Sequence, residues 1–114
     1  MSRVVLRNNI PRVSSMAHQY LGEAVERTAA TVLSRSQERA PKDTGEGAAS
    51  GFYEMVTDLE AVVGFSAEHM LYQELGTSRM AAQPFLVPSL EEQAQPFQEA
   101  IIEAIDRAAK EATR

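Results

Sequence analysis

Apolar side chains recur every three to four residues over positions 12–40, the period of one face of an amphipathic helix. Pro11 suits the first turn of such a helix, and Pro41 disfavours helix at Ala40 before it. Gly22, inside the segment, either lowers helix stability by about 1 kcal/mol against Ala or marks close packing. We therefore predict one long first helix that lies across a broad surface. The apolar positions are Val13, Ala17, Tyr20, Leu21, Ala24, Thr28, Val32 and Leu33.

A glycine-rich segment and two short apolar segments follow. Residues 41–51 hold three glycines and a proline, which predicts a loop. Residues 52–57 and 61–65 are rich in aromatic and β-branched side chains, which favours two strands joined by a short turn. Because an isolated hairpin is unstable in water, we expect the first helix to cover it.

The second half of the chain predicts a short helix, an extended stretch and a final helix. Residues 68–75 favour the short helix, closed by Gly76 as a left-handed cap. Residues 77–88, with Pro84 and Pro88 around Phe85-Leu86-Val87, predict an extended stretch or an edge strand. Ser89 is the expected N-cap of the last helix, which Pro96 should kink or delay. The expected apolar stripe of this helix is Leu90, Ala94, Phe97, Ile101, Ala104, Ile105 and Ala108.

Composition narrows the class to one ordinary globular domain over residues 1–114. The chain has no cysteine, and His18 and His69 lie far apart, so we expect no metal site and no cofactor. No apolar run is long enough to span a bilayer and no signal peptide stands out, so we expect no membrane partner and an intracellular site of folding.

Charge is unevenly spread along the chain. Residues 1–40 carry +3, residues 41–80 carry −5 and residues 81–114 carry −3. The overall acidity argues against tight binding of nucleic acid. Residues 1–10 form an expected N-terminal arm, and the first twelve residues contain Arg3, Arg7 and Arg12 but no acidic residue. Two interpretations remain open: a flexible arm with solvated charges, or an arm that docks on an acidic neighbour.

Two short motifs have both structural and chemical interpretations. In residues 40–45, Asp43 and Thr44 can accept bonds from nearby backbone N–H groups and Gly45 can supply a positive φ, whereas the spacing of a phosphate-binding loop is missing. Glu74 could act in catalysis only with a second carboxylate, from Asp43 or Glu54, and nothing in the sequence brings these together. We therefore expect Glu74 to bind a backbone N–H or an arginine such as Arg79.

Methionines are scattered through the sequence together with two phenylalanines. Core filling is one interpretation, because Met packs irregular gaps, and an adaptable subunit interface is the other. The residues are Met16, Met55, Met70, Met80, Phe85 and Phe97.

Four blocks, in this order and spacing, resemble a phage tail-component family named after the tenth gene product of a lambdoid siphophage. The family covers tail-completion and head-to-tail joining proteins, and the resemblance runs over nearly the whole chain. After Gly45 the family continues with a Leu-Arg-like pair, where this chain has Gly47 and Ala48. The blocks are residues 40–45, 63–65, 72–77 and 80–88. Their motif residues are Pro41, Asp43, Thr44, Gly45, Tyr72, Glu74, Gly76, Thr77, Pro84, Phe85 and Pro88.

The resemblance implies an α+β fold, with a long N-terminal helix and a C-terminal helix packed on a small antiparallel sheet. It implies a non-enzymatic virion protein of the tail or neck, assembled in the host cytoplasm as a homo-oligomeric, hexameric ring. Its partners would be the tail-tube protein and the head-connector proteins, and DNA would pass through the lumen without specific binding. An adaptor or stopper on the head side and a small prophage-encoded binding module are the alternatives. The expected interface residues are Arg3, Arg7, Arg12 and Met80, and the expected lumen residues are Asp43, Glu46, Glu54, Asp58 and Glu60.

Overall fold

The computed structural model describes residues 10–41 and 45–113, and their side chains from residue 14 onward. The long helices are α1 (Ile10–Arg39) and α4 (Leu86–Ala112). Between them lie α2 (Gly45–Ala49), β1 (Gly51–Thr57), β2 (Glu60–Phe65) and α3 (His69–Leu75). The predicted α+β arrangement of two long helices packed on a small antiparallel sheet is confirmed.

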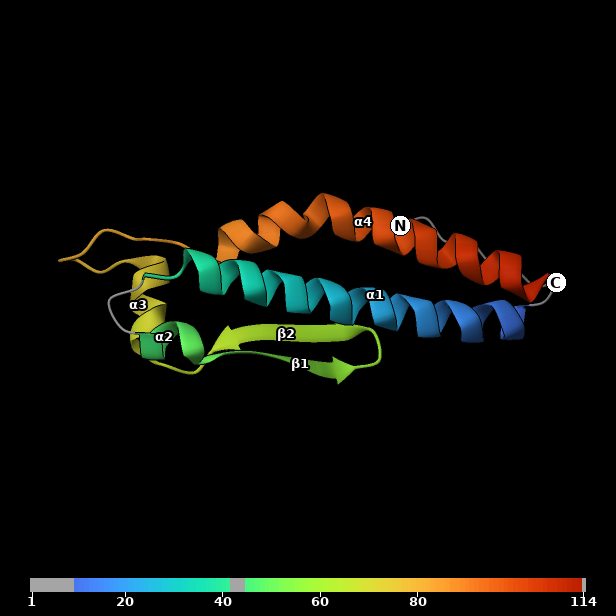
Figure 1. Ribbon diagram of the computed structural model, residues 1–114, viewed down its shortest axis with the longest axis horizontal. Helices are drawn as coiled ribbons and strands as arrows, with labels where there is room; N and C mark the ends of the chain where they lie inside the picture. Colours follow the sequence, from blue (N-terminus) through green and yellow to red (C-terminus); the bar gives the residue numbers. More distant parts are fainter. Residues whose placement is uncertain (1–9, 42–44, 114) are drawn as a thin grey trace.

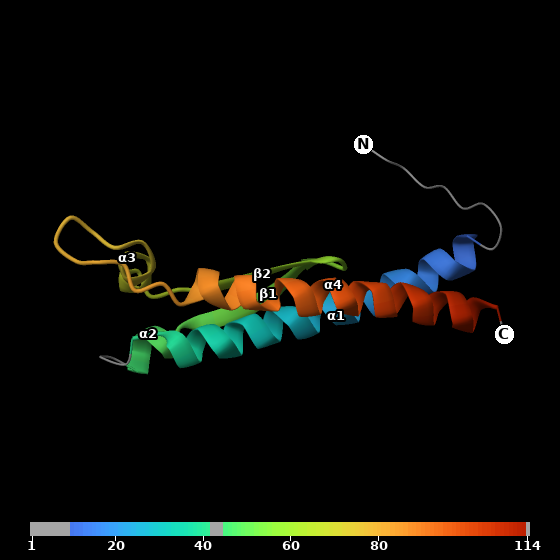
Figure 2. The same ribbon diagram turned by 90° about the horizontal axis from the view of Figure 1, so that it is seen from above.

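Helix α1 is the central element of an elongated molecule. Figure 1 shows α4 running antiparallel to α1 along one side and the β1–β2 hairpin along the other. The short helices α2 and α3 lie together at one end, where the loop between α3 and α4 projects outward (Figures 1 and 2). The principal extents are 59 × 28 × 20 Å, so the domain is far from spherical.

The hairpin lies against α1 with one of its two faces. Strands β1 and β2 pair antiparallel from Gly51 opposite Phe65 to Thr57 opposite Glu60, with an irregularity near the turn. A Cβ added at Gly51 would meet the Leu33 side chain of α1 at 2.7 Å, so the face that contains Gly51 is the inner one. Side chains alternate across a strand, so Phe52 and Val62 lie on the outer face, where they are 40% and 49% exposed.

Close packing explains the glycine inside α1. A Cβ at Gly22 would lie 2.8 Å from the backbone oxygen of Asp58 in the hairpin turn. The second interpretation of Gly22, close packing, is therefore the correct one. An exposed bond from His18 to Asp58, at 3.1 Å, joins the same two elements.

Alanines form much of the seam between α1 and α4. Ala104, Ala108 and Ala112 of α4 are buried at a spacing of four residues, and Ala24 and Ala29 of α1 are buried as well. Residues four apart lie on one helical face, so small side chains line the contact on both helices. Of the larger apolar residues of α4, Ile102 and Ile105 are left exposed on other faces.

A second core lies at the end of the molecule that carries α2 and α3. Ala40, Met70 and Phe85 are each at most 3% exposed there. The rings of Phe65 and Phe85 meet edge to face, with 5.0 Å between centroids. Met70 thus fills the core, as one of the two interpretations of the methionines expected.

Three local predictions are wrong. Residues 45–49 of the expected loop form α2. The extended stretch expected over residues 77–88 ends early, because the chain is helical from Leu86, with Pro88 in the first turn, where a proline is tolerated. Ser89 is no N-cap: it is buried, and its hydroxyl donates to the Phe85 carbonyl oxygen at 2.7 Å.

Three further predictions hold in part. Gly76 has the expected positive φ of 75°, but its ψ of 172° lies outside the left-handed helical region. Pro96 lies inside α4 without delaying its start, and Figure 1 shows this helix bent along its length. In the expected stripe of α4, Ala104 and Ala108 are buried, whereas Leu90 and Ile105 are 58% and 48% exposed.

Candidate functional site

Glu74 joins two of the sequence blocks. Its carboxylate accepts hydrogen bonds from the backbone N–H groups of Phe85 at 2.9 Å, Leu86 at 2.8 Å and Val87 at 3.2 Å. These are the first donors of α4, which have no partner within the helix. The expectation of a bond to backbone N–H is confirmed, and the carboxylate is engaged in holding the start of α4.

The loop between α3 and α4 is folded back on itself. The N–H of Gln83 donates to the carbonyl oxygen of Gln73 at 2.7 Å, and Thr77 and Met80 bond across a tight turn. A Cβ at Gly76 would lie 2.7 Å from the Ala82 nitrogen, so glycine is needed for both the space and the positive φ. Residues 72–77 and 80–88 therefore form one structural unit.

The other expected site residues are only partly covered. Asp43, Thr44, Arg3 and Arg7 lie outside the described residues, as does the side chain of Arg12. The remaining motif residues lie on several elements. Pro41 and Gly45 lie before and at the start of α2, Tyr72 and Glu74 on α3, Gly76, Thr77 and Pro84 in the projecting loop, and Phe85 and Pro88 at the start of α4. Met80 is half-buried in that loop. The interface roles of Met80 and the three arginines stay predictions.

The described acidic residues of the expected lumen are all exposed. Glu46 lies on α2, at one end of the hairpin, and Asp58 and Glu60 lie at the other end. Glu54 and Glu60 share the outer face of the hairpin, because Glu54 is opposite Val62 and Glu60 is two residues from it. Their role in a lumen remains a prediction.

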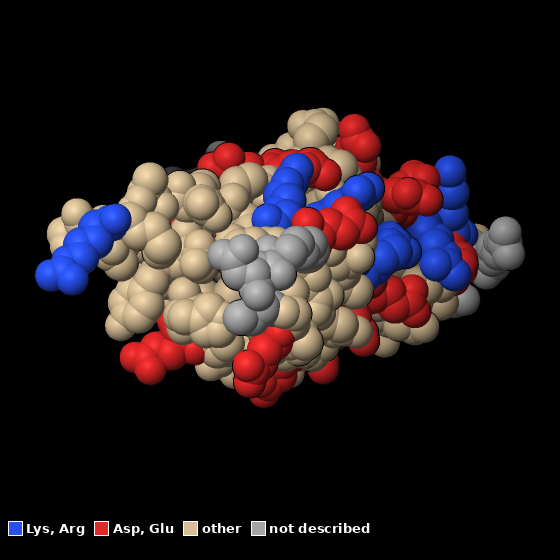
Figure 3. Space-filling view, turned by 60° about the vertical axis from the view of Figure 1, so that its left-hand side comes forward, with Lys and Arg blue, Asp and Glu red and all other residues tan. Residues whose placement is uncertain are grey.

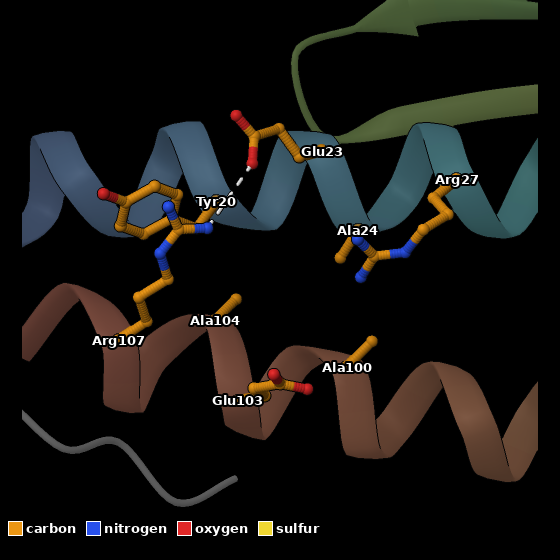
Figure 4. A pocket seen from close by; sticks show the side chains of 8 residues that line it. All are labelled: Tyr20, Glu23, Ala24, Arg27, Ala100, Glu103, Ala104 and Arg107. Atoms are coloured by element: carbon orange, nitrogen blue, oxygen red, sulfur yellow. Dashed lines mark ion pairs between the residues drawn. The ribbon is translucent and has the colours of Figure 1, made fainter.

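A small polar pocket of about 70 Å³ lies between α1 and α4, a constellation that sequence reasoning missed. Figure 4 shows the Arg107 guanidinium over the Tyr20 ring, and its carbon lies 4.0 Å from the ring centroid. Arg107 also reaches Glu23 at 4.0 Å and Glu111 at 3.3 Å. The Tyr20 hydroxyl donates to the Glu111 carboxylate, and this bond raises the pKa of Tyr20 above its ordinary value. These contacts tie the two long helices together.

Large apolar side chains on the surface are the feature with the clearest functional meaning. The described residues leave twelve of them exposed, and nine of these gather in three places, which scattered surface positions would not explain. In Figure 3, which brings the projecting end forward, uncharged side chains cover most of the left half of the surface.

Three surfaces can be defined. The end patch consists of Leu71, Tyr72 and Leu75 on α3. The groove has a volume of about 450 Å³ between α1, β2 and α4. The α4 stripe consists of Ile102 and Ile105, which are 68% and 48% exposed.

Sequence reasoning missed the end patch and the α4 stripe, although one signal for the stripe was present. Ile101 and Ile102 are adjacent, and neighbours in a helix point about 100° apart, so a single buried stripe cannot take both. The end patch had no such sequence signal, since a seven-residue helix is too short for its apolar residues to show a helical period.

Comparison with models of protein families, with curated proteins and with solved structures gave no match. Within residues 10–41 and 45–113, no helix is long and apolar enough to cross a membrane. Nor do these residues bring together three histidine, aspartate or glutamate side chains that would hold a metal ion.

Proposed function

We propose that this chain is a structural protein of a long-tailed bacteriophage or prophage. It assembles into a homo-oligomeric ring, of about six copies by the resemblance, at the head-proximal end of the tail. The ring completes the tail and joins it to the head connector, and DNA passes through its lumen. Its work is assembly, with no catalytic step and no cofactor.

The observation that carries this proposal is the set of large apolar side chains that the single subunit leaves exposed. Leu75 of the end patch and Ile102 of α4 are 69% and 68% exposed, and Leu90 beside the groove is 58% exposed. Apolar surface that gathers in patches marks a site of contact with another protein.

A ring would cover such surface in two places. Each subunit of a ring makes two interfaces, and a standard interface covers about 800 Å² on each partner, so about 1,600 Å² per subunit. The exposed apolar side chains lie in separate places, which supports contacts between unlike surfaces. The resemblance of the four sequence blocks supplies the class of assembly.

Light scattering of the purified protein, over a range of concentration and salt, tests this proposal. We expect a closed oligomer near six copies, which persists at high salt if apolar surfaces dominate the contact. A strict monomer that also fails to co-purify with the tail-tube and head-connector proteins would contradict the proposal. Which of the two partners binds decides between a terminator and a head-side adaptor or stopper.

A further inference from the structure

The groove follows the unpaired edge of β2. Its floor is α1, with Val25, Ala29 and Val32, and its far wall is α4, with Leu90 and Phe97. On the hairpin side it is lined by side chains from both faces of the sheet, Val63 from the inner face and Val62 from the outer face. Both faces can line one groove only along the edge of the strand. Among the described residues β2 pairs with β1 alone, so this edge is open.

The end patch is a convex apolar surface at one end of the molecule. Leu71, Tyr72 and Leu75 are 56%, 46% and 69% exposed. Leu75 is four residues from Leu71 and three from Tyr72, so it lies between them and the three form one broad exposed side of α3. The opposite side of the same helix carries Met70, which is 3% exposed in the core. Helix α3 is therefore anchored by one apolar side and presents a second one to solvent.

We propose that the end patch of one copy fills the groove of the next copy in the ring. This inference rests on the proposed function and names the contact that builds it. A convex patch cannot cover another convex patch well, and a groove cannot fill a groove, so the two surfaces complement each other and not themselves. The dimensions agree, because residues 60–63 of β2, which line the groove, span about 13 Å and a seven-residue helix is about 10 Å long.

Charge supports the same pairing. Arg79 lies on the projecting loop next to α3, and Glu60 lines the groove. Both side chains are exposed, and within the described part of the chain neither makes an ion pair. Seating α3 in the groove of a neighbour brings an unpaired cation to an unpaired carboxylate at the rim.

The proposed contact is head to tail, because it joins two different surfaces of the subunit. The end patch and the groove lie at different places on each subunit, so every copy offers one and accepts at the other. Such a contact repeats around a closed ring. The α4 stripe takes no part in it and stays available for a different neighbour.

Cysteine cross-linking tests the contact directly, because the natural chain contains no cysteine. The variants Leu75→Cys and Val62→Cys are mixed at assembly concentration and oxidised. We expect a disulfide-linked dimer from the mixture and none from either variant alone. A chain carrying both changes should give a ladder of covalent oligomers that ends at the ring size. Leu75→Cys mixed with Ile102→Cys is the matched control, because Ile102 is as exposed as Leu75 but lies outside the groove, and it should stay unlinked.

Substitution supplies a second readout on the uncross-linked protein. Leu75→Ser should raise the concentration needed for assembly at least tenfold with an unchanged melting temperature, because the side chain is exposed in the subunit. Arg79→Glu should weaken assembly by at most about fivefold, and adding Glu60→Arg should restore it.

The outcomes separate this contact from the ring itself. Light scattering that shows a closed oligomer, without the mixed cross-link, would overturn the contact and leave the proposed function standing. Linkage of Leu75→Cys to itself would also overturn it, in favour of a symmetric pairing of end patches. A monomer at every concentration that also fails to co-purify with the tail-tube and head-connector proteins would refute both proposals together.

Discussion

Substitution of Glu74 tests directly whether its carboxylate stabilises the start of α4. Replacing Glu74 with Ala removes the acceptor for three backbone N–H groups at the start of α4. A hydrogen bond to a charged group contributes about 1.5–3 kcal/mol, and loss of a helix cap costs about 0.5–2 kcal/mol. The N–H of Val87 is exposed, so water can replace the carboxylate as its acceptor. Phe85 is only 2% exposed, so water cannot reach its N–H without a change in the fold. We therefore expect a loss of about 2–4 kcal/mol for Glu74→Ala and about half of that for Glu74→Gln.

That loss is a large part of the total stability. A chain of 114 residues has a free energy of unfolding of about 6–17 kcal/mol. At about 4 °C per kcal/mol, Glu74→Ala should lower the melting temperature by about 8–16 °C. Thermal and urea unfolding followed by circular dichroism measure this, at a fixed protein concentration because assembly shifts the midpoint.

Glu68 provides the matched control. It is an exposed carboxylate at the N-terminus of α3, where it makes no side-chain cap bond. Glu68→Gln should therefore change the stability by no more than about 0.5 kcal/mol. If Glu74→Ala lost less than about 1 kcal/mol, or no more than Glu68→Gln, the carboxylate would not be holding α4, and our account of this end of the molecule would fail.

Two further predictions concern α1. Gly22→Ala should destabilise the protein by about 1–3 kcal/mol in urea unfolding, since the new Cβ would lie 2.8 Å from the Asp58 carbonyl oxygen. Gly45→Ala is the control, because a Cβ there meets nothing within 4 Å. A Gly22→Ala variant more stable than the natural protein would contradict the close packing. Because the bond to Glu111 raises the pKa of Tyr20, the folded state holds that proton more tightly, so this contribution is present below pH about 10 and is lost as pH rises through the folded pKa. Tyrosinate absorbance should show one tyrosine that titrates late and is missing in Tyr20→Phe, and the stability difference between the two proteins should shrink above pH about 10.

Much of the architecture could be predicted from local pattern. Helix α1 shows a long, clear period between Pro11 and Pro41, and the hairpin shows dense β-branched and aromatic content. In α1 and in the hairpin, apolar side chains that define the sequence pattern also pack between the two elements, so the pattern predicts the packing. The cover of the hairpin by α1 followed from the instability of an isolated hairpin alone.

The start of α4 could not be predicted in the same way. Sequence signals favoured an extended stretch between Pro84 and Pro88 and a cap at Ser89. The structure instead begins the helix at Leu86, because Glu74, more than ten residues earlier, supplies the cap from another helix. A cap that arrives through tertiary structure leaves no local signal, and it frees Ser89 to be buried next to Arg39, whose guanidinium donates to its hydroxyl at 3.0 Å.

The apolar stripe expected for α4 from the sequence differs from the residues that α4 buries in the single subunit. The period of this helix identifies apolar positions, but it cannot say which of them meet α1 and which meet solvent. In the structure the seam takes alanines such as Ala104 and Ala108, while Ile102 and Ile105 lie outside. An alanine side chain buries little area, so the seam gives each helix less hydrophobic stabilisation than the isoleucines would, at about 25 cal/mol per Å². The chain thus holds large apolar side chains outside its own core, where they would contribute to stability only if the neighbour that we propose covered them.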